Sequence, residues 1–423
     1  MNAPLLTTLP AAQPAQPLAA RYAATRQRSQ ALIAPLSAED CSAQSMPDAS
    51  PAKWHLAHTT WFFETFVLEP NEPGFAPFNP AFRVLFNSYY NGVGARHPRP
   101  QRGLLTRPGL AEVLAYRADV DARMERLLPT LAATPGLAAL VELGVQHEQQ
   151  HQELLLTDIK HLLGCSPLYP PYAATALDAP LPAARARAWL RWEGGLCDIG
   201  HEGSGFAFDN ETPRHRVYLQ PFELASRLVT NAEFAAFVDG GGYADPALWL
   251  AEGWDWRTAQ GIAHPMYWRH DASGWQAFTL GGLQPLHGDA PALHLSYYEA
   301  DAFARWAGAR LPTEAEWEHA ALTAPALGHT LEQLFDVAWQ WTQSSYAAYP
   351  GFRTAEGAVG EYNGKFMVNQ YVLRGSSCAT PPGHARSSYR NFFPATTRWQ
   401  FTGVRLARDG GGPGQACPAE KPF

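Results

Sequence analysis

The chain has 423 residues, which is long for a single hydrophobic core and predicts two or three domains. Charged residues make up only 17% of it, the formal net charge is −7, and no run of Lys or Arg stands out. This balance argues against nucleic acid or an anionic membrane as a partner. The five scattered cysteines form no CxxC pair, so a disulfide framework is not expected. No stretch approaches the roughly 20 apolar residues of a membrane span, and the N-terminus lacks the pattern of a secretory signal, so we expect a cytoplasmic protein.

Composition divides the chain into five segments. Residues 1–19 are rich in Ala, Pro and Gln and are expected to be disordered. Residues 20–165 show helical periodicity, and a Pro/Ala-rich linker is expected over 166–187. Residues 188–408 alternate short apolar runs with Gly, Trp and Tyr, and 409–423 are expected to form a flexible tail. The fold class expected is therefore α+β multidomain, with a helical domain before one that has little regular secondary structure.

Four helices can be placed from local signals. One starts at Ser50-Pro51, with Ser as the N-cap and Pro at the first helical position. A second covers about 137–163 and ends before Gly164 and Pro167. In the later domain only two helices are expected, over Asn231–Val238 and Ser296–Gly308. Residues 70–108 are expected to form a long loop, and such loops inside compact domains are usually functional.

Three histidines are candidate metal ligands. His147 and His151 are four residues apart on an expected helix, so both imidazoles lie on one face, although a pair of surface histidines has the same spacing. His58 is the candidate third ligand, because bundles form metal sites from inward side chains of facing helices. His55 points about 60° further round its helix and is less favoured. Asp158 shares the face of the pair and could orient His151 by accepting a hydrogen bond. Zinc and iron both accept three imidazoles, so the donors leave the metal open.

The same segment also fits a peptidase pattern. His147 to His151 reads H-E-x-x-H, in which Glu148 would be the general base of a zinc hydrolase. A metzincin would carry its third His ten residues after the first, where this chain has Thr157. The gluzincin arrangement needs a downstream helix carrying Glu, whereas a Pro-rich linker follows here. Because the motif is short and often matched by chance, the zinc hydrolase is kept as a minor alternative.

Three long strings resemble one known family. MPDASPAKWHLAHTTWFFETFVLEP, HEQQHQELLLTDIKH and EYNGKFMVNQYVLRGSSCATPPGHARSSYRNFFPATTRWQFTGVRLA are similar to segments of the bacterial sulfoxide synthases of ergothioneine biosynthesis. The resemblance covers about residues 20 to 408. It implies an N-terminal DinB-like four-helix bundle. It also implies a C-terminal domain similar to formylglycine-generating enzymes, an irregular C-type-lectin-like architecture.

The resemblance also implies a reaction. Members of the family use Fe(II) and O2 to attach the sulfur of cysteine or γ-glutamylcysteine to C2 of the imidazole of hercynine, which is Nα,Nα,Nα-trimethylhistidine. The product is a sulfoxide. The family's three iron ligands match His58, His147 and His151. The implied partners are therefore small molecules, and the implied cofactor is Fe(II) with O2 as co-substrate.

Residues for the substrates are carried over in the same way. Gln150 matches the family Gln that contacts the substrate imidazole, where an amide can donate or accept without titrating. Asn391, Phe392 and Phe393 match the segment around the quaternary ammonium, which aromatic faces and amide oxygens suit. Asp48 could add a complementary charge there.

The long loop supplies the remaining candidates. Tyr89 and Tyr90 match a tyrosine pair that reaches the iron site in the similar branch of the family, and a phenol there can deliver a proton. The residues do not decide which of the two does so. Arg99, and less clearly Arg96 or Arg102, could clamp the carboxylate of the thiol substrate.

Other activities on this scaffold stay open. A formylglycine-generating enzyme needs a pair of cysteines, and Cys378 has no second cysteine near it in the sequence. Two sister reactions also fit this scaffold: selenoneine synthesis, and attachment at the other imidazole carbon as in ovothiol biosynthesis. The sequence hardly distinguishes them from the leading hypothesis. A lectin-like domain could also be a non-catalytic binding module. The oligomeric state is not predicted.

Overall fold

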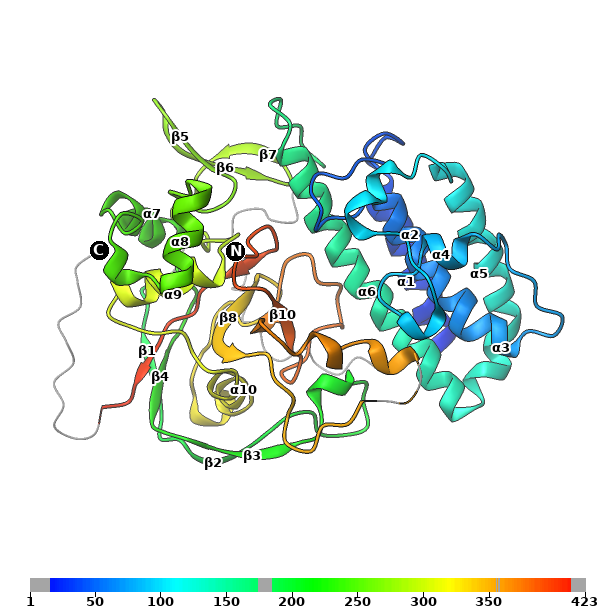
Figure 1. Cartoon of the computed structure of the whole chain (residues 1–423). Coiled ribbons are helices and arrows are strands. Elements are labelled where there is room, and N and C mark those ends of the chain that lie inside the picture. The colour runs from blue at the N-terminus through cyan, green and yellow to red at the C-terminus, as the bar shows by residue number, and fades with distance from the viewer. Residues whose placement is uncertain (1–15, 174–184, 355, 357, 412–423) are drawn as a thin grey trace, which may run out of the picture.

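The computed structural model describes residues 16–173, 185–354, 356 and 358–411 (Figure 1). Most of the predicted disordered N-terminus, the middle of the linker and nearly all of the predicted tail fall outside these residues. Helix α1 begins at Leu18, and β1 begins at Trp189. The exact domain boundaries stay predictions. No helix among the described residues is both long enough and apolar enough to cross a bilayer.

Over residues 16–173 the N-terminal part is a bundle of four main helices, as predicted. α1 packs on α6, and α2 packs against both α5 and α6. Short helices and 3₁₀ turns fill the segment between α2 and α5, which was expected to be a plain loop. The helices of this part are α1 (Leu18–Ile33), α2 (Ala52–Phe62), the π-helix η1 (Phe63–Leu68), α3 (Glu69–Asn71), α4 (Phe82–Leu85), the 3₁₀ helices η2 (Asn91–Val93) and η3 (Arg99–Leu104), α5 (Leu110–Ala132) and α6 (Pro135–Gly164).

Helix α2 lies at the centre of the bundle. All eleven of its residues are buried, which is typical of a helix surrounded by protein on every side. The predicted start is one residue early, because Pro51, with an extended backbone, occupies the N-cap in place of Ser50, and Ala52 is the first helical residue. The helix continues without a break into the π-helical turn η1, and π-helical turns are frequent at functional sites. Both α2 and α6 run where the sequence predicted helices.

The described residues of the C-terminal part form four small sheets. The largest has the order β10-β9-β8-β11, in which β8 pairs antiparallel with β9 and parallel with β11. The others have the orders β1-β4-β12, β5-β6-β7 and β2-β3. The strands are β1 (Trp189–Trp192), β2 (Gly195–Ile199), β3 (His215–Leu219), β4 (Phe222–Ala225), β5 (Trp268–Asp271), β6 (Gly274–Thr279), β7 (Gly282–Pro285), β8 (Ala338–Ser345), β9 (Tyr371–Ser376), β10 (Asn391–Phe393), β11 (Thr402–Gly403) and β12 (Ala407–Asp409).

From residue 185 on, the part of the chain that the structure describes has four helices of nine or ten residues, where the sequence predicted two. The predicted pair is present as α7 (Asn231–Asp239) and α9 (Tyr297–Trp306), each with a Ser or Thr N-cap and a Glu three residues on. The expectation of only two was wrong, because α8 (Ala251–Gln260) and α10 (Glu314–Thr323) also form. The remaining 3₁₀ turns are η4 (Asp209–Glu211), η5 (Pro246–Leu248), η6 (Pro325–Leu327), η7 (Ala358–Glu361) and η8 (Gly364–Phe366).

Two local features explain the missed helices. Thr313 caps α10 through a capping box with Glu316, a signal that the sequence did contain. In α8, Gly253 weakens the helical pattern, since glycine lowers helix propensity. A Cβ at Gly253 would come within 2.6 Å of the ring of Tyr298, so close packing requires glycine there.

Helix α6 belongs to both parts of the molecule. It lies between the rest of the bundle and the C-terminal sheets (Figure 1). Its Glu153 accepts hydrogen bonds from Trp339 at 2.7 Å, from Ser377 at 2.6 Å and from Thr380 at 2.7 Å. The helix that carries two candidate ligands is thus also one that the C-terminal part contacts.

Candidate metal centre

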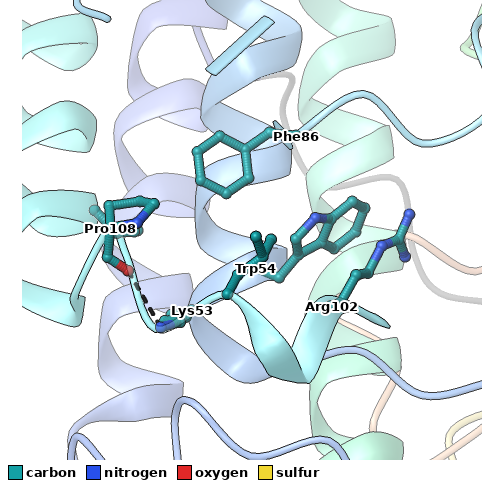
Figure 2. A pocket seen from close by; sticks show the side chains of 7 residues that line it. Lys53, Trp54, Phe86, Arg102 and Pro108 are labelled. Carbon is teal, nitrogen blue, oxygen red and sulfur yellow. Dashed lines mark hydrogen bonds between the residues drawn. The ribbon is translucent and has the colours of Figure 1, made fainter. Parts of the chain in front are cut away.

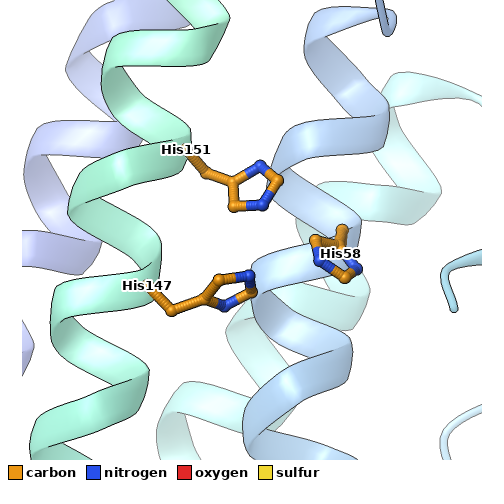
Figure 3. Close-up of side chains that lie close together, drawn as sticks. All are labelled: His58, His147 and His151. Atoms are coloured by element: carbon orange, nitrogen blue, oxygen red, sulfur yellow. The ribbon is translucent and has the colours of Figure 1, made fainter. Parts of the chain in front are cut away.

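Three histidines from two helices meet inside the bundle. His58 projects from α2 toward His147 and His151, which lie one turn apart on α6 (Figure 3). Each can offer one ring nitrogen, and these three nitrogens lie within 4.8 Å of one another. This is the one group of three or more His, Cys, Asp or Glu side chains in the described residues whose ligand atoms come this close. The three predicted ligands are therefore brought together.

The ring nitrogens of this cluster are short of protein partners. His58 Nδ1–H donates to the carbonyl oxygen of Phe86 at 2.6 Å, which leaves the lone pair on Nε2. That Nε2 atom and both nitrogens of His147 are buried without a hydrogen-bond partner among the described residues. Buried polar atoms of this kind are costly unless something else satisfies them. A metal ion fits this donor set, because it would bind the lone pairs that the protein leaves unused.

Burial also keeps the three rings neutral. It lowers the pKa of His147 to about 3 and holds the pKa of His58 and of His151 well below the usual value for histidine. Neutral imidazole is the form that binds a metal. The cluster is therefore in its ligating state at neutral pH.

His151 is oriented by a neighbouring ring rather than directly by a carboxylate. His55 Nδ1 lies 2.9 Å from His151 Nδ1, and His55 Nε2 lies 3.0 Å from Asp158 Oδ2. Asp158 thus acts on His151 only through His55, whereas the sequence suggested a direct contact. Both nitrogens of His55 are engaged, which agrees with its being the less favoured ligand.

Glu148 points away from the histidines. Its carboxylate, 1% exposed, is paired with Arg26 at 2.8 Å and with Arg117, and it accepts from Ser29 at 2.5 Å. The two guanidinium groups lower its pKa to about 2, although burial alone would raise it. A carboxylate held in this way between α1 and α5 cannot act as a base on water at the metal. The H-E-x-x-H string is therefore part of the bundle core.

Aromatic rings pack around His58. The indole of Trp54 stacks on it with ring centroids 4.6 Å apart, and Trp61 stacks at 5.6 Å. Arg102 lies over the Trp54 ring, 3.3 Å from its centroid. Figure 2 shows a small pocket beside Trp54 with two basic side chains and no acidic one in its lining, which comprises Lys53, Trp54, Phe86, Arg102, Leu105, Pro108 and Val113.

The C-terminal part completes the surroundings of the histidines. The side chain of Gln150, next to His151, donates to the hydroxyl of Tyr389 at 2.5 Å and accepts from the hydroxyl of Tyr362. The ring of Tyr362 lies 5.6 Å from that of His147. Sequence reasoning did not single out either tyrosine, because both come from irregular segments more than 200 residues after Gln150 in the chain. The candidate site is thus enclosed by both parts of the molecule.

Comparison with known proteins agrees with this two-part architecture. A model of the DinB superfamily matches residues 21–155, and a model of the sulfatase-modifying factor enzyme 1-like domain matches 176–333. The hercynine oxygenase of Mycolicibacterium smegmatis is 31% identical over 86% of this chain and 92% of its own. That of Mycobacterium tuberculosis is 32% identical over 93% of this chain and 98% of its own. The chain belongs to the hercynine oxygenase family.

Membership in the hercynine oxygenase family makes the chain an oxygenase. A formylglycine-generating enzyme from Streptomyces coelicolor is 39% identical, but over only 34% of this chain and 50% of its own. That similarity covers one domain, whereas the hercynine oxygenases share both. The N-terminal bundle with its histidines therefore distinguishes the chain from formylglycine-generating enzymes.

Tyr89 and Tyr90 are separated from His58 by the ring of Trp61. Their rings stack with centroids 4.7 Å apart. Tyr90 is fully buried 5.5 Å from Trp61, and its hydroxyl has no hydrogen-bond partner among the described residues. Tyr89 lies 6.3 Å from Tyr362. Burial raises the pKa of both tyrosines, so both phenols keep their protons at neutral pH.

Two residues of the C-terminal part, Glu361 and Lys365, bind the segment that carries these tyrosines. Glu361 accepts from the backbone N–H groups of Asn91 at 3.0 Å and of Gly92 at 2.6 Å. Lys365 pairs with Glu361 at 2.8 Å and donates to the carbonyl oxygen of Tyr89. The segment that carries the tyrosine pair is thus held by residues that come about 270 positions later in the chain.

The three candidate arginines differ in their surroundings. Arg99 is exposed and donates to the carbonyl oxygen of Asp48, and Arg96 is exposed near Ser88. Arg102 is 3% exposed and donates to the hydroxyls of Ser50 and Ser88, and no carboxylate pairs with it in the described part of the chain. Burial lowers the pKa of Arg102 to about 8. Of the three arginines, Arg102 is therefore the one whose charge is buried and has no acidic partner among the described residues.

The segment Asn391–Phe393 forms strand β10. Phe392 stacks on Tyr346 with centroids 4.0 Å apart and lies 6.1 Å from Phe366. Phe366 in turn lies 5.2 Å from Tyr89. Within the described residues, no hydrogen bond, ion pair or ring contact joins Asp48 to this strand, and Asp48 lies beside Arg99 instead. The structure thus links β10 to the tyrosine pair but not to Asp48.

Proposed function

We propose that the chain is a non-heme Fe(II)- and O2-dependent sulfoxide synthase. It would join the sulfur of a thiol, cysteine or γ-glutamylcysteine, to C2 of the imidazole ring of hercynine in ergothioneine biosynthesis. The family membership supports the oxygenase class and hercynine as substrate. The observation that carries the proposal is the cluster of three neutral imidazoles, of which His58 and His147 are buried with nitrogen atoms that have no partner among the described residues.

The proposed reaction balances without an external reductant. The thiol loses its S–H hydrogen, the imidazole loses its C2–H hydrogen, and a C–S bond forms between them. One oxygen atom of O2 becomes the sulfoxide oxygen, and the other leaves as water with the two hydrogens. Iron fits this overall change better than zinc, because bound Fe(II) supplies one-electron chemistry with O2.

The residues of α6 would hold the imidazole of hercynine. Gln150 lies one position before His151, and its amide is positioned by the hydroxyls of Tyr362 and Tyr389. An amide held from both sides presents a fixed hydrogen-bonding group that does not titrate. Asn391, Phe392 and Phe393 are the proposed contacts for the quaternary ammonium, on the side of the site that β10 approaches.

The long segment between α2 and α5 would supply the proton and the charge. The hydroxyl of Tyr89 or Tyr90 is the proposed proton donor, and burial keeps both phenols protonated until they are used. Arg99 is the proposed clamp for the thiol's carboxylate, with Arg102 the stronger second candidate because its buried charge has no acidic partner among the described residues. Asp48 beside Arg99 would help to position that arginine.

Product analysis tests the proposal. Purified enzyme loaded anaerobically with Fe(II) is offered hercynine and O2 together with cysteine, γ-glutamylcysteine or a selenium donor in turn, and the products are measured by mass spectrometry. We expect a hercynyl sulfoxide with one of the two thiols. A seleno product alone, or attachment at the other imidazole carbon, would replace this proposal by a sister reaction. The cytoplasmic location and the absence of nucleic-acid partners stay predictions.

A further inference from the structure

A chain of three hydrogen bonds leads from a backbone amide to the candidate metal centre. Asp158 Oδ2 accepts from the backbone N–H of Ser50 at 2.8 Å. The same oxygen lies 3.0 Å from His55 Nε2, and His55 Nδ1 lies 2.9 Å from His151 Nδ1. Asp158 is 6% exposed and His55 is 4% exposed, so solvent contributes little to these contacts. This series of hydrogen bonds connects the residues just before α2 with α6.

The hydrogens in this chain can be placed one after another. A carboxylate only accepts, so the contact with Asp158 requires a hydrogen on His55 Nε2. A neutral His55 then has its lone pair on Nδ1. The contact between the two Nδ1 atoms needs one hydrogen, which must therefore sit on His151. This leaves the lone pair of His151 on Nε2, as the backbone contact of His58 does for that ring.

We infer that His55 is a positioning residue that, together with Asp158, fixes the tautomer and the ring orientation of His151. The inference rests on the proposed metal centre but not on the proposed substrates. Histidine ligands usually donate their second N–H to a carboxylate or a carbonyl group, and removing such partners typically costs about 10–100-fold in metal affinity. Here a second imidazole stands between the ligand and the carboxylate.

Its neighbours explain why His55 relays rather than binds. Both of its nitrogens are used, one by Asp158 and one by His151, so no lone pair remains for a metal. The ring lies 5.9 Å from that of Trp54 in an edge-on contact, which limits its rotation. Ser50 holds the far end, because its backbone N–H keeps the accepting oxygen of Asp158 in place.

Two substitutions at one position separate hydrogen bonding from packing. His55→Leu removes both polar contacts, whereas in His55→Gln the amide can accept from His151 Nδ1–H and donate to Asp158. The readouts are the Co(II) dissociation constant of the full chain, measured by chelator competition, and the absorption spectrum of bound Co(II). We expect His55→Leu to weaken Co(II) binding about 10–100-fold and to change the spectrum. His55→Gln should regain most of the affinity.

A matched control is His161→Leu. His161 is also a buried histidine, on the same helix as His151, and it contacts Ser45 at 2.7 Å outside the chain described above. This variant should keep the wild-type Co(II) affinity. Folding of every variant is checked by thermal unfolding.

Three outcomes would contradict the inference or its basis. Wild-type affinity in a folded His55→Leu variant would overturn the inference while leaving the metal centre intact. Equal losses in His55→Leu and His55→Gln would overturn the assignment of hydrogens and leave only packing. Failure of the wild-type protein to bind Co(II) would instead remove the metal centre itself, and with it the proposed function.

Discussion

The carboxylate of Glu153 on α6 accepts a hydrogen bond from the indole N–H of Trp339 on β8, at 2.7 Å. Ser377 and Thr380 donate to the same carboxylate. One half-buried carboxylate, two residues after His151, therefore joins the C-terminal part to the helix that carries two candidate ligands. The alignment of Gln150 with its two tyrosines depends on this junction.

Replacing Glu153 with Leu should destabilise the protein. Three buried donors would lose their acceptor, and each one left unsatisfied costs about 1–3 kcal/mol. Glu153→Gln keeps one acceptor oxygen and should lose less. Urea denaturation measures the free energy of unfolding, with Glu125→Leu, at an exposed position of α5, as the control. Equal stabilities of Glu153→Leu and the control would contradict the importance of this junction.

Glu148→Gln should lower stability but not abolish the chemistry. The substitution leaves Arg26 and Arg117 without their buried carboxylate, which costs about 3–5 kcal/mol. Because Glu148 does not face the histidines, folded variant at low temperature should retain metal and product formation. In a zinc hydrolase the same change would remove the general base. If the folded Glu148→Gln variant kept its full metal content but lost its catalytic activity, this result would favour the zinc hydrolase.

The same residue predicts a pH dependence of stability. Glu148 ionises with a pKa of about 2 in the folded protein, against a value of about 4.5 for an exposed glutamate. Its contribution is therefore fully present above about pH 4.5 and is lost as the pH falls toward 2, because the unfolded chain takes up the proton first. The difference corresponds to about 3 kcal/mol in the free energy of unfolding. Glu148→Gln should make the acid limb of the stability profile less steep, as measured by urea denaturation between about pH 2 and pH 7.

Tyr89→Phe and Tyr90→Phe should change turnover or product ratio without changing metal content. A positioned proton donor typically contributes about 10²–10⁴-fold to rate. The variant that removes the donor should slow sulfoxide formation on this scale, and oxidation of the thiol alone can then compete. The measurement is product ratio by mass spectrometry beside metal analysis. Normal rates and products in both variants would place the proton donor elsewhere.

Part of the candidate site could be predicted from the sequence, because it depends on helical spacing. His147 and His151 share a face through their separation of four, and His58 follows from the inward face of the earlier helix. The orientation of Glu148 also follows from helix geometry, since the residue after His147 is rotated by about 100° and faces the bundle core. Resemblance alone supplied Gln150 and the tyrosine pair.

Contacts between distant segments could not be predicted in the same way. The place of His55 between Asp158 and His151 depends on the distance between α2 and α6, which no local pattern encodes. Tyr362 and Tyr389 lie in segments without helical or strand periodicity, so nothing marked them as neighbours of Gln150. The link between Glu361 and the segment before α5 is of the same kind.

The most direct test of the central claim is O2 consumption by metal-free protein reloaded anaerobically with either Fe(II) or Zn(II), beside a His58→Ala variant treated identically. The account predicts O2 uptake only with Fe(II), only when hercynine and a thiol are both present, and none with His58→Ala, which should also fail to retain stoichiometric iron. Substrate-dependent O2 uptake by the zinc form, or stoichiometric iron in His58→Ala, would contradict it.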